Sequence, residues 1–119
     1  MTNSYGAPEI SVQDVAAKVA ANEDFILLDV REPNELDAAA IADARVVNVP
    51  LSVLAQQRTA ALPEAAQDKD AEIVVFCHHG GRSAQVTAWL LGQGWTNVLN
   101  MDGGIERWAT GVDASVGRY

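Results

Sequence analysis

The residues best suited to do chemistry lie in one glycine-rich stretch, residues 77–83. Cys77 is the only cysteine in the sequence, and it directly follows an apolar run that ends at Phe76. A thiol between a strand and a helix meets unpaired N–H groups and the positive end of the helix dipole, which favour its thiolate. The stretch therefore predicts a nucleophilic sulfur in an anion-binding loop. We expect Cys77 to be catalytic and the other six residues to bind substrate: His78, His79, Gly80, Gly81, Arg82 and Ser83.

Each residue type in this loop has a physical role to fill. Gly80 and Gly81 permit backbone conformations that point several N–H groups at one atom. Arg82 adds a permanent cation whose fork suits oxyanions, and the two histidines line the pocket with hydrogen bonds or, as pH falls, positive charge. A lone cysteine is more often a buried apolar side chain, but the Gly-Gly-Arg-Ser that follows Cys77 reverses this expectation. Adjacent histidines do not readily chelate one ion together with this cysteine, so we expect no metal and no cofactor.

The elements that position this loop follow from the alternation of apolar runs and helical segments. Residues 25–30, 45–49, 72–76 and 98–101 are predicted strands, and helical patterns separate them. The fold class is therefore α/β, with a mostly parallel central sheet of about five strands and helices on both faces. With 119 residues, the chain fits a single domain. We expect its core over about residues 10–110 and loose ends over residues 1–8 and 111–119.

The charge balance narrows the function classes. Sixteen acidic and eight basic residues give a net charge of −8, which disfavours nucleic acids and anionic membranes as partners. No apolar run approaches the roughly 20 residues that span a bilayer. The first ten residues lack the pattern of a signal peptide, so we expect a cytoplasmic protein and, with no interface suggested, a monomer.

Three segments together make the sequence recognisable. They are residues 29–35 (Asp-Val-Arg-Glu-Pro-Asn-Glu), the loop 77–83, and residues 94–108 with their Gly-Trp and Gly-Gly-Ile-Glu-Arg-Trp groups. Over roughly residues 10–109, the chain resembles the single-domain rhodaneses, a sulfurtransferase family whose cysteine carries a persulfide. The resemblance implies that Cys77 accepts a sulfane sulfur and passes it to a thiophilic acceptor. It also implies that the backbone amides of residues 78–82 surround that sulfur.

Two further positions match the family. Asp29 and Arg31 correspond to its Asp-x-Arg element, which lies near the active-site loop. A structural ion pair that holds the strand end explains them equally well. One segment departs from the family, because many relatives carry a His-Ile-Pro-Gly-Ala-like turn where this chain has residues 40–45, Ala-Ile-Ala-Asp-Ala-Arg.

Other functions compete with sulfur transfer. Related folds use a cysteine and an arginine as a phosphatase or arsenate reductase, but five residues separate that pair and only four separate Cys77 from Arg82. A non-catalytic domain that senses sulfide or docks a partner is the second alternative. For a sulfurtransferase, the partners are a small-molecule or protein sulfur donor and a thiol acceptor. Thiosulfate, glutathione persulfide and a protein persulfide stay open as donors.

Overall fold

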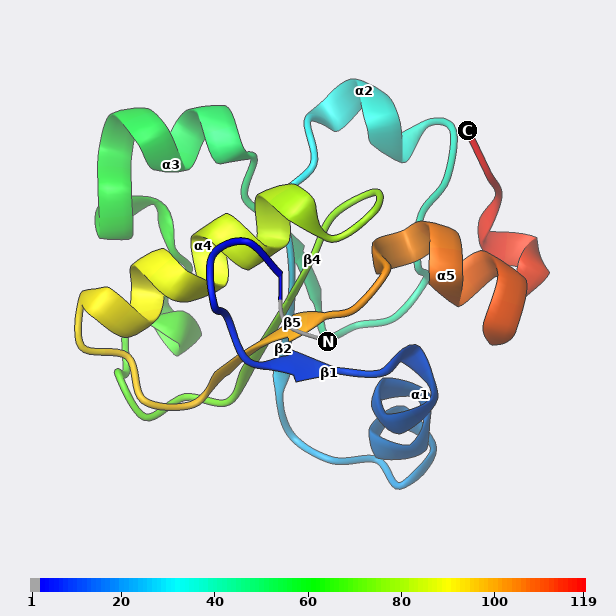
Figure 1. The fold of residues 1–119 in the computed structure, drawn as a ribbon, viewed down its shortest axis with the longest axis horizontal. Helices are drawn as coiled ribbons and strands as arrows, with labels where there is room; N and C mark the ends of the chain where they lie inside the picture. Colours follow the sequence, from blue (N-terminus) through cyan, green and yellow to red (C-terminus); the bar gives the residue numbers. More distant parts are fainter. Residues whose placement is uncertain (1–2) are drawn as a thin grey trace.

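The computed structural model describes residues 3–119, and within them a parallel sheet of five strands carries the fold. The strand order is β1-β5-β4-β2-β3, and each of the four pairings is parallel. This arrangement confirms the predicted α/β class (Figure 1). The strands are β1 (Glu9–Ile10), β2 (Ile26–Asp29), β3 (Val46–Asn48), β4 (Ile73–Phe76) and β5 (Val98–Met101).

Helices cover both faces of the sheet. Helices α1 and α5 lie on one side, and α3 and α4 lie on the other, with the short α2 above one edge (Figure 1). The α-helices are α1 (Val12–Ala20), α2 (Pro33–Leu36), α3 (Leu51–Gln57), α4 (Gly81–Gly92) and α5 (Gly104–Gly111). Three 3-10 helices complete the elements: η1 (Arg58–Ala61), η2 (Glu64–Ala66) and η3 (Ala114–Val116).

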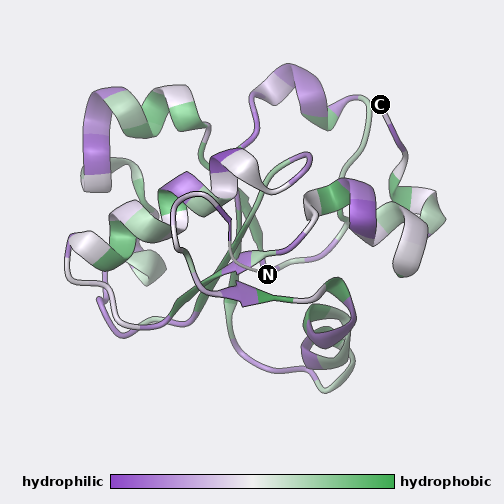
Figure 2. Cartoon of the chain, in the orientation of Figure 1, coloured by the Kyte–Doolittle hydropathy of each residue, from purple (hydrophilic) through white to green (hydrophobic). Residues whose placement is uncertain are grey.

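The two central strands explain why their sequences are continuously apolar. Successive strand residues face opposite sides of a sheet. Leu27 of β2 therefore packs in the core under α1 and α5, whereas Leu28 packs in the core under α3 and α4. Because helices bury both faces, no position in the middle of the strand favours a polar side chain. The apolar colour of the inner strands contrasts with the mixed colour of the helices in Figure 2.

The register of the central strands brings the predicted site together. Asp29, the last residue of β2, pairs with Phe76, the last residue of β4. The segments that follow these strands therefore leave the sheet at the same edge. This is where parallel α/β sheets place their functional groups. Cys77 and Arg31 both lie in these segments.

Each end segment, for which loose structure is expected, contains one anchored residue among mostly exposed ones. Ala7 is buried, and the Asn3 side-chain amide donates to its carbonyl at 3.0 Å. At the other end, Val116 of η3 is buried and accepts a hydrogen bond from Ala40 N at 3.0 Å. Single anchoring residues hold both segments, so they have no apolar periodicity that a sequence pattern would show. Residues 1–2 lie outside the described residues.

The segment that departs from the family builds its turn with side chains. Ile41 packs into the core. Asp43 accepts a hydrogen bond from Arg45 N at 2.9 Å and pairs with the Arg45 guanidinium at 3.1 Å. This local contact holds the turn before β3.

Candidate active site

Three hydrogen-bond donors converge on the sulfur of Cys77. The amides of Gly80 and Ser83 lie 3.1 and 3.4 Å from Sγ, and the Ser83 hydroxyl lies 3.3 Å from it. Gly80 has φ +104°, a left-handed conformation that glycine adopts without strain, and it caps the N-terminus of α4. Cys77 is only 1% exposed, so its sulfur lies inside the loop. This arrangement stabilises a negative charge on the sulfur.

Helix α5 holds the same loop from the carbonyl side. The amide of Ile105 donates to the Cys77 carbonyl at 2.9 Å, and the amide of Glu106 donates to the His78 carbonyl at 3.1 Å. This approach requires glycine at position 104, where φ is +62°. A Cβ there would lie 2.5 Å from both carbonyl oxygens. In the sequence this residue stands out only as part of the Gly-Gly-Ile-Glu-Arg-Trp group.

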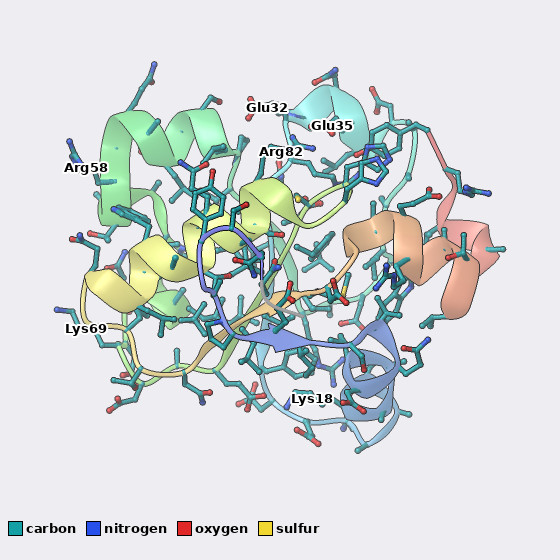
Figure 3. All side chains as sticks on the ribbon, viewed as in Figure 1. Lys18, Glu32, Glu35, Arg58, Lys69 and Arg82 are labelled. Carbon is teal, nitrogen blue, oxygen red and sulfur yellow. The ribbon has the colours of Figure 1, made fainter. Side chains whose placement is uncertain are left out.

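Arg82 points to a carboxylate of the chain itself. Its two terminal nitrogens lie 2.7 and 2.8 Å from the two oxygens of Glu35 in α2. Figure 3 shows the two side chains meeting between α2 and α4. The hydrogen bond from Arg82 lowers the pKa of Glu35 to about 2. In turn Glu35, and to a lesser extent the charge on Cys77, raise the pKa of Arg82.

The Asp29–Arg31 pair is buried at the end of β2. Arg31 Nε and Nη2 donate to the two Asp29 oxygens at 3.0 and 2.8 Å, and Nη1 donates to the Ala39 carbonyl at 2.8 Å. Arg31 is fully buried, and its bonds tie the end of β2 to the segment after α2. These contacts favour the structural interpretation of the pair over a catalytic one.

The two histidines form a stack with a residue that the sequence did not single out. The ring of His78 lies 3.8 Å from that of His79 and 3.7 Å from that of Tyr119. Burial, followed by the nearby His79, lowers the pKa of His78. The Tyr119 hydroxyl donates to Glu35 at 2.8 Å and accepts from Arg31 Nη1 at 3.2 Å.

The structure therefore separates the predicted loop residues. Gly80 and Ser83 contact the sulfur, whereas His79 and Gly81 are exposed and Arg82 faces Glu35. Glu35 and Tyr119 are the site residues that sequence reasoning missed. Glu35 belongs to the segment 29–35 that carries the family resemblance, which was a usable signal. Nothing in the local sequence marks Tyr119.

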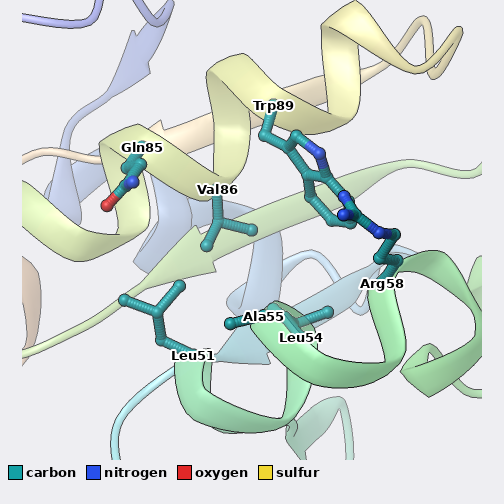
Figure 4. Close-up of a pocket in the computed structure, with 7 residues that line it drawn as sticks. All are labelled: Leu51, Leu54, Ala55, Arg58, Gln85, Val86 and Trp89. Carbon is teal, nitrogen blue, oxygen red and sulfur yellow. The ribbon is translucent and has the colours of Figure 1, made fainter.

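A separate groove of about 190 Å³ lies between α3 and α4 (Figure 4). None of its lining residues belongs to the loop 77–83, so it has no part in the chemistry considered below. The lining residues are Leu51, Leu54, Ala55, Arg58, Gln85, Val86 and Trp89.

In the part of the chain that the structure describes, no group of three or more histidine, cysteine, aspartate or glutamate side chains could hold a metal ion. Within residues 3–119, no helix is long and apolar enough to cross a membrane.

Comparison with known proteins assigns the family. The family described as the rhodanese-like domain matches residues 11–110, which is most of the chain. The chain therefore belongs to the rhodanese-like domain family. This agrees with the fold, the sulfur-binding loop and the resemblance seen in the sequence.

Similar proteins include several named sulfurtransferases. A sulfurtransferase of Allochromatium vinosum is 36% identical over 101 residues, which cover 85% of this chain and 87% of that protein. The thiosulfate sulfurtransferase GlpE of Pseudomonas syringae is 33% identical over 79% of this chain and 81% of its own length. Among solved structures, the human single-domain sulfurtransferase TSTD1 superposes with a TM-score of 0.71 at 26% identity, covering 89% of this chain and 98% of its own.

Proposed function

We propose that this protein is a rhodanese-type sulfurtransferase in which Cys77 carries the transferred sulfur as a persulfide. The convergence of two amides and one hydroxyl on the Cys77 sulfur is the observation that carries the proposal. Donors aimed at a sulfur stabilise both the attacking thiolate and the persulfide anion that replaces it. The names of the relatives support the same class of reaction.

The first step loads the sulfur. The Cys77 thiolate attacks the outer sulfur of the donor, and a new S–S bond forms at Sγ. With thiosulfate, the donor's own S–S bond breaks and sulfite leaves with the bonding electron pair. With a thiol persulfide, a thiolate leaves in the same way, so neither donor requires an external oxidant or reductant.

The second step unloads it. A thiophilic acceptor attacks the outer sulfur of the persulfide, and Cys77 departs as a thiolate. Cyanide becomes thiocyanate, and a thiol acceptor becomes a persulfide. The amides of Gly81 and Arg82 lie in the first turn of α4, where they have no acceptor within the helix. They are the next donors available to the outer sulfur.

The size of the loop favours sulfur over phosphate. A persulfide adds one atom to Cys77, whereas a phosphate ester brings several oxygens that each require donors within about 3 Å. Four residues between Cys77 and Arg82 make a short loop, and Arg82 is engaged by Glu35. We therefore expect no meaningful hydrolysis of an aryl phosphate. A sensing or docking role without catalysis is not favoured by any contact at the site.

The proposal is tested by steady-state kinetics. Thiocyanate formation from thiosulfate and cyanide is measured for the wild type and for Cys77→Ser, with aryl phosphate hydrolysis measured in parallel. Glutathione and thioredoxin then replace cyanide, and glutathione persulfide replaces thiosulfate. We expect turnover with at least one donor and none in the variant. Phosphatase turnover comparable with sulfur transfer, and dependent on Cys77, would overturn the assignment.

A further inference from the structure

The Glu35 carboxylate accepts more hydrogen bonds than an exposed surface carboxylate usually does. It accepts four hydrogen bonds, and its side chain is 16% exposed. Two come from Arg82 at 2.7 and 2.8 Å, one from the Tyr119 hydroxyl at 2.8 Å and one from the Glu32 amide at 2.9 Å. Four donors fix this anion in one position beside the Cys77 loop.

The same contacts change what Arg82 offers to a substrate. A bidentate carboxylate occupies the fork that would otherwise grip an anion, and it cancels the positive charge. Arg82 is the only lysine or arginine within the loop 77–83. An anionic donor that approaches this guanidinium therefore meets a carboxylate that is already in place.

We propose that Glu35 is a specificity-determining residue that disfavours doubly charged sulfur donors and favours donors with less negative charge beside the sulfane sulfur. The favoured class includes thiol persulfides and thiosulfonates. This inference rests on the proposed function, because it names the donor class of that same site. Repulsion from a fixed charge grows with the charge of the approaching group, so a dianion is penalised about twice as much as a monoanion.

Two alkylating reagents test the charge effect without any sulfur transfer. Iodoacetate and iodoacetamide both alkylate a thiolate with loss of iodide, but only iodoacetate is charged. Cys77 is the only thiol in the chain, so both rates report the same atom. Both reagents need the same opening to reach the buried sulfur, so the ratio of their rates reports charge and cancels access.

The variant Glu35→Gln removes the charge and keeps the side-chain size. With the amide oxygen in place of Oε2, the side chain still accepts from the Glu32 amide, and its NH2 group can donate to the Tyr119 hydroxyl oxygen. The matched control is Glu32→Gln in the same turn, because the Glu32 carboxylate accepts from the Ser52 hydroxyl at 2.7 Å and not from Arg82. We expect the iodoacetate-to-iodoacetamide ratio to rise about tenfold in Glu35→Gln and to stay unchanged in the control. Glu35→Ala replaces Glu35→Gln if the latter does not fold.

Two sulfur donors of different charge test the same effect during catalysis. Thiosulfate is a dianion, and methanethiosulfonate is a monoanion of similar shape in which a methyl group replaces one oxygen. We expect Glu35→Gln to raise kcat/KM for thiosulfate about tenfold more than for methanethiosulfonate, through KM more than kcat. A general loss of structure would lower kcat/KM for both donors together.

The outcomes separate this inference from the proposed function. If the alkylation ratio rises but no variant transfers sulfur, the proposed function fails and the charge role of Glu35 stands. An unchanged ratio in Glu35→Gln, or an equal rise in Glu32→Gln, overturns the inference even where sulfur transfer is robust. If neither alkylation nor sulfur transfer occurs, both proposals are overturned. A Cys77 sulfur that no reagent can reach has no donor specificity.

Discussion

The amide of Ile105 donates a 2.9 Å hydrogen bond to the carbonyl oxygen of Cys77, so the start of α5 holds the backbone of the nucleophile. The start of α4 meets the same residue on its other side, where the Gly80 and Ser83 amides face the sulfur. Cys77 is thus fixed between two helix N-termini. Positions in α5 that never touch the sulfur are therefore expected to affect its reactivity.

Gly104→Ala tests this support. The left-handed φ and the 2.5 Å approach to two carbonyl oxygens leave no room for a methyl group. We expect the free energy of unfolding to fall by about 2 kcal/mol or more, and sulfur transfer to fall further than this loss explains. The matched control is Gly92→Ala, because a Cβ at Gly92 meets nothing within 4 Å and φ is ordinary. Chemical denaturation measures the loss of unfolding free energy, and turnover at low temperature measures the loss of sulfur transfer. Equal effects in the two variants would refute the support role.

The buried Asp29–Arg31 pair is expected to stabilise the fold rather than to take part in chemistry. Arg31→Met leaves the Asp29 carboxylate buried without its partner, which costs about 3–5 kcal/mol of unfolding free energy. Arg107→Met breaks an exposed pair with Asp102 and should cost less than about 1 kcal/mol. Urea denaturation compares them. A stably folded Arg31→Met that has lost all turnover would point to a catalytic role instead.

Arg82→Ala leaves the Glu35 carboxylate without its guanidinium partner. The unpaired negative charge of Glu35 then repels a dianionic donor, so thiosulfate turnover should fall roughly tenfold to a hundredfold. Donors with less charge should lose less. The double variant Arg82→Ala/Glu35→Gln should recover part of the thiosulfate activity, because it also removes the repelling charge. Equal losses for thiosulfate and methanethiosulfonate in Arg82→Ala, with no recovery in the double variant, would argue against this account.

The Glu35–Arg82 pair also predicts a pH dependence of stability. The pKa of Glu35 is about 2 in the folded protein, against an ordinary value of 4.5. The unfolded chain binds this proton more tightly, so the stabilisation is present above pH 4.5 and is lost as pH falls toward 2. The lost contribution is at most about 3 kcal/mol. In denaturant titrations, the stability gap between wild type and Glu35→Gln should narrow over this range. A constant gap would show that the charge of Glu35 is not what stabilises the pair.

The parts of the fold that could be predicted from sequence are those with a repeating local signal. β2 and β4 are buried on both faces, so β4 is one continuous apolar run and β2 is one up to Asp29. The two-residue β1 has no such run, and it is a strand only because β5 pairs with it. The docking of residues 114–119 depends on Val116 and Tyr119, whose neighbours in sequence are small, charged or glycine.

The candidate site also has a part that the local sequence could predict and a part that it could not. The loop 77–83 was predictable because its functional groups belong to consecutive residues, and Ser83 was included for that reason. The Glu35–Arg82 pair joins positions 47 residues apart, and the Arg31–Tyr119 contact spans 88 residues. No local pattern connects such positions. Arg82 was therefore expected to face a donor, whereas the fold brings a carboxylate to it.

The most direct test of the account is the mass of the peptide that contains Cys77. The wild-type protein is incubated with thiosulfate, methanethiosulfonate or glutathione persulfide, separated from the donor and digested without reductant. We expect one additional sulfur atom on this peptide with at least one donor. We also expect that cyanide removes this atom and forms an equal amount of thiocyanate. An unmodified Cys77 after treatment with every donor, in a protein that is fully folded, would contradict the claim that this residue carries sulfur.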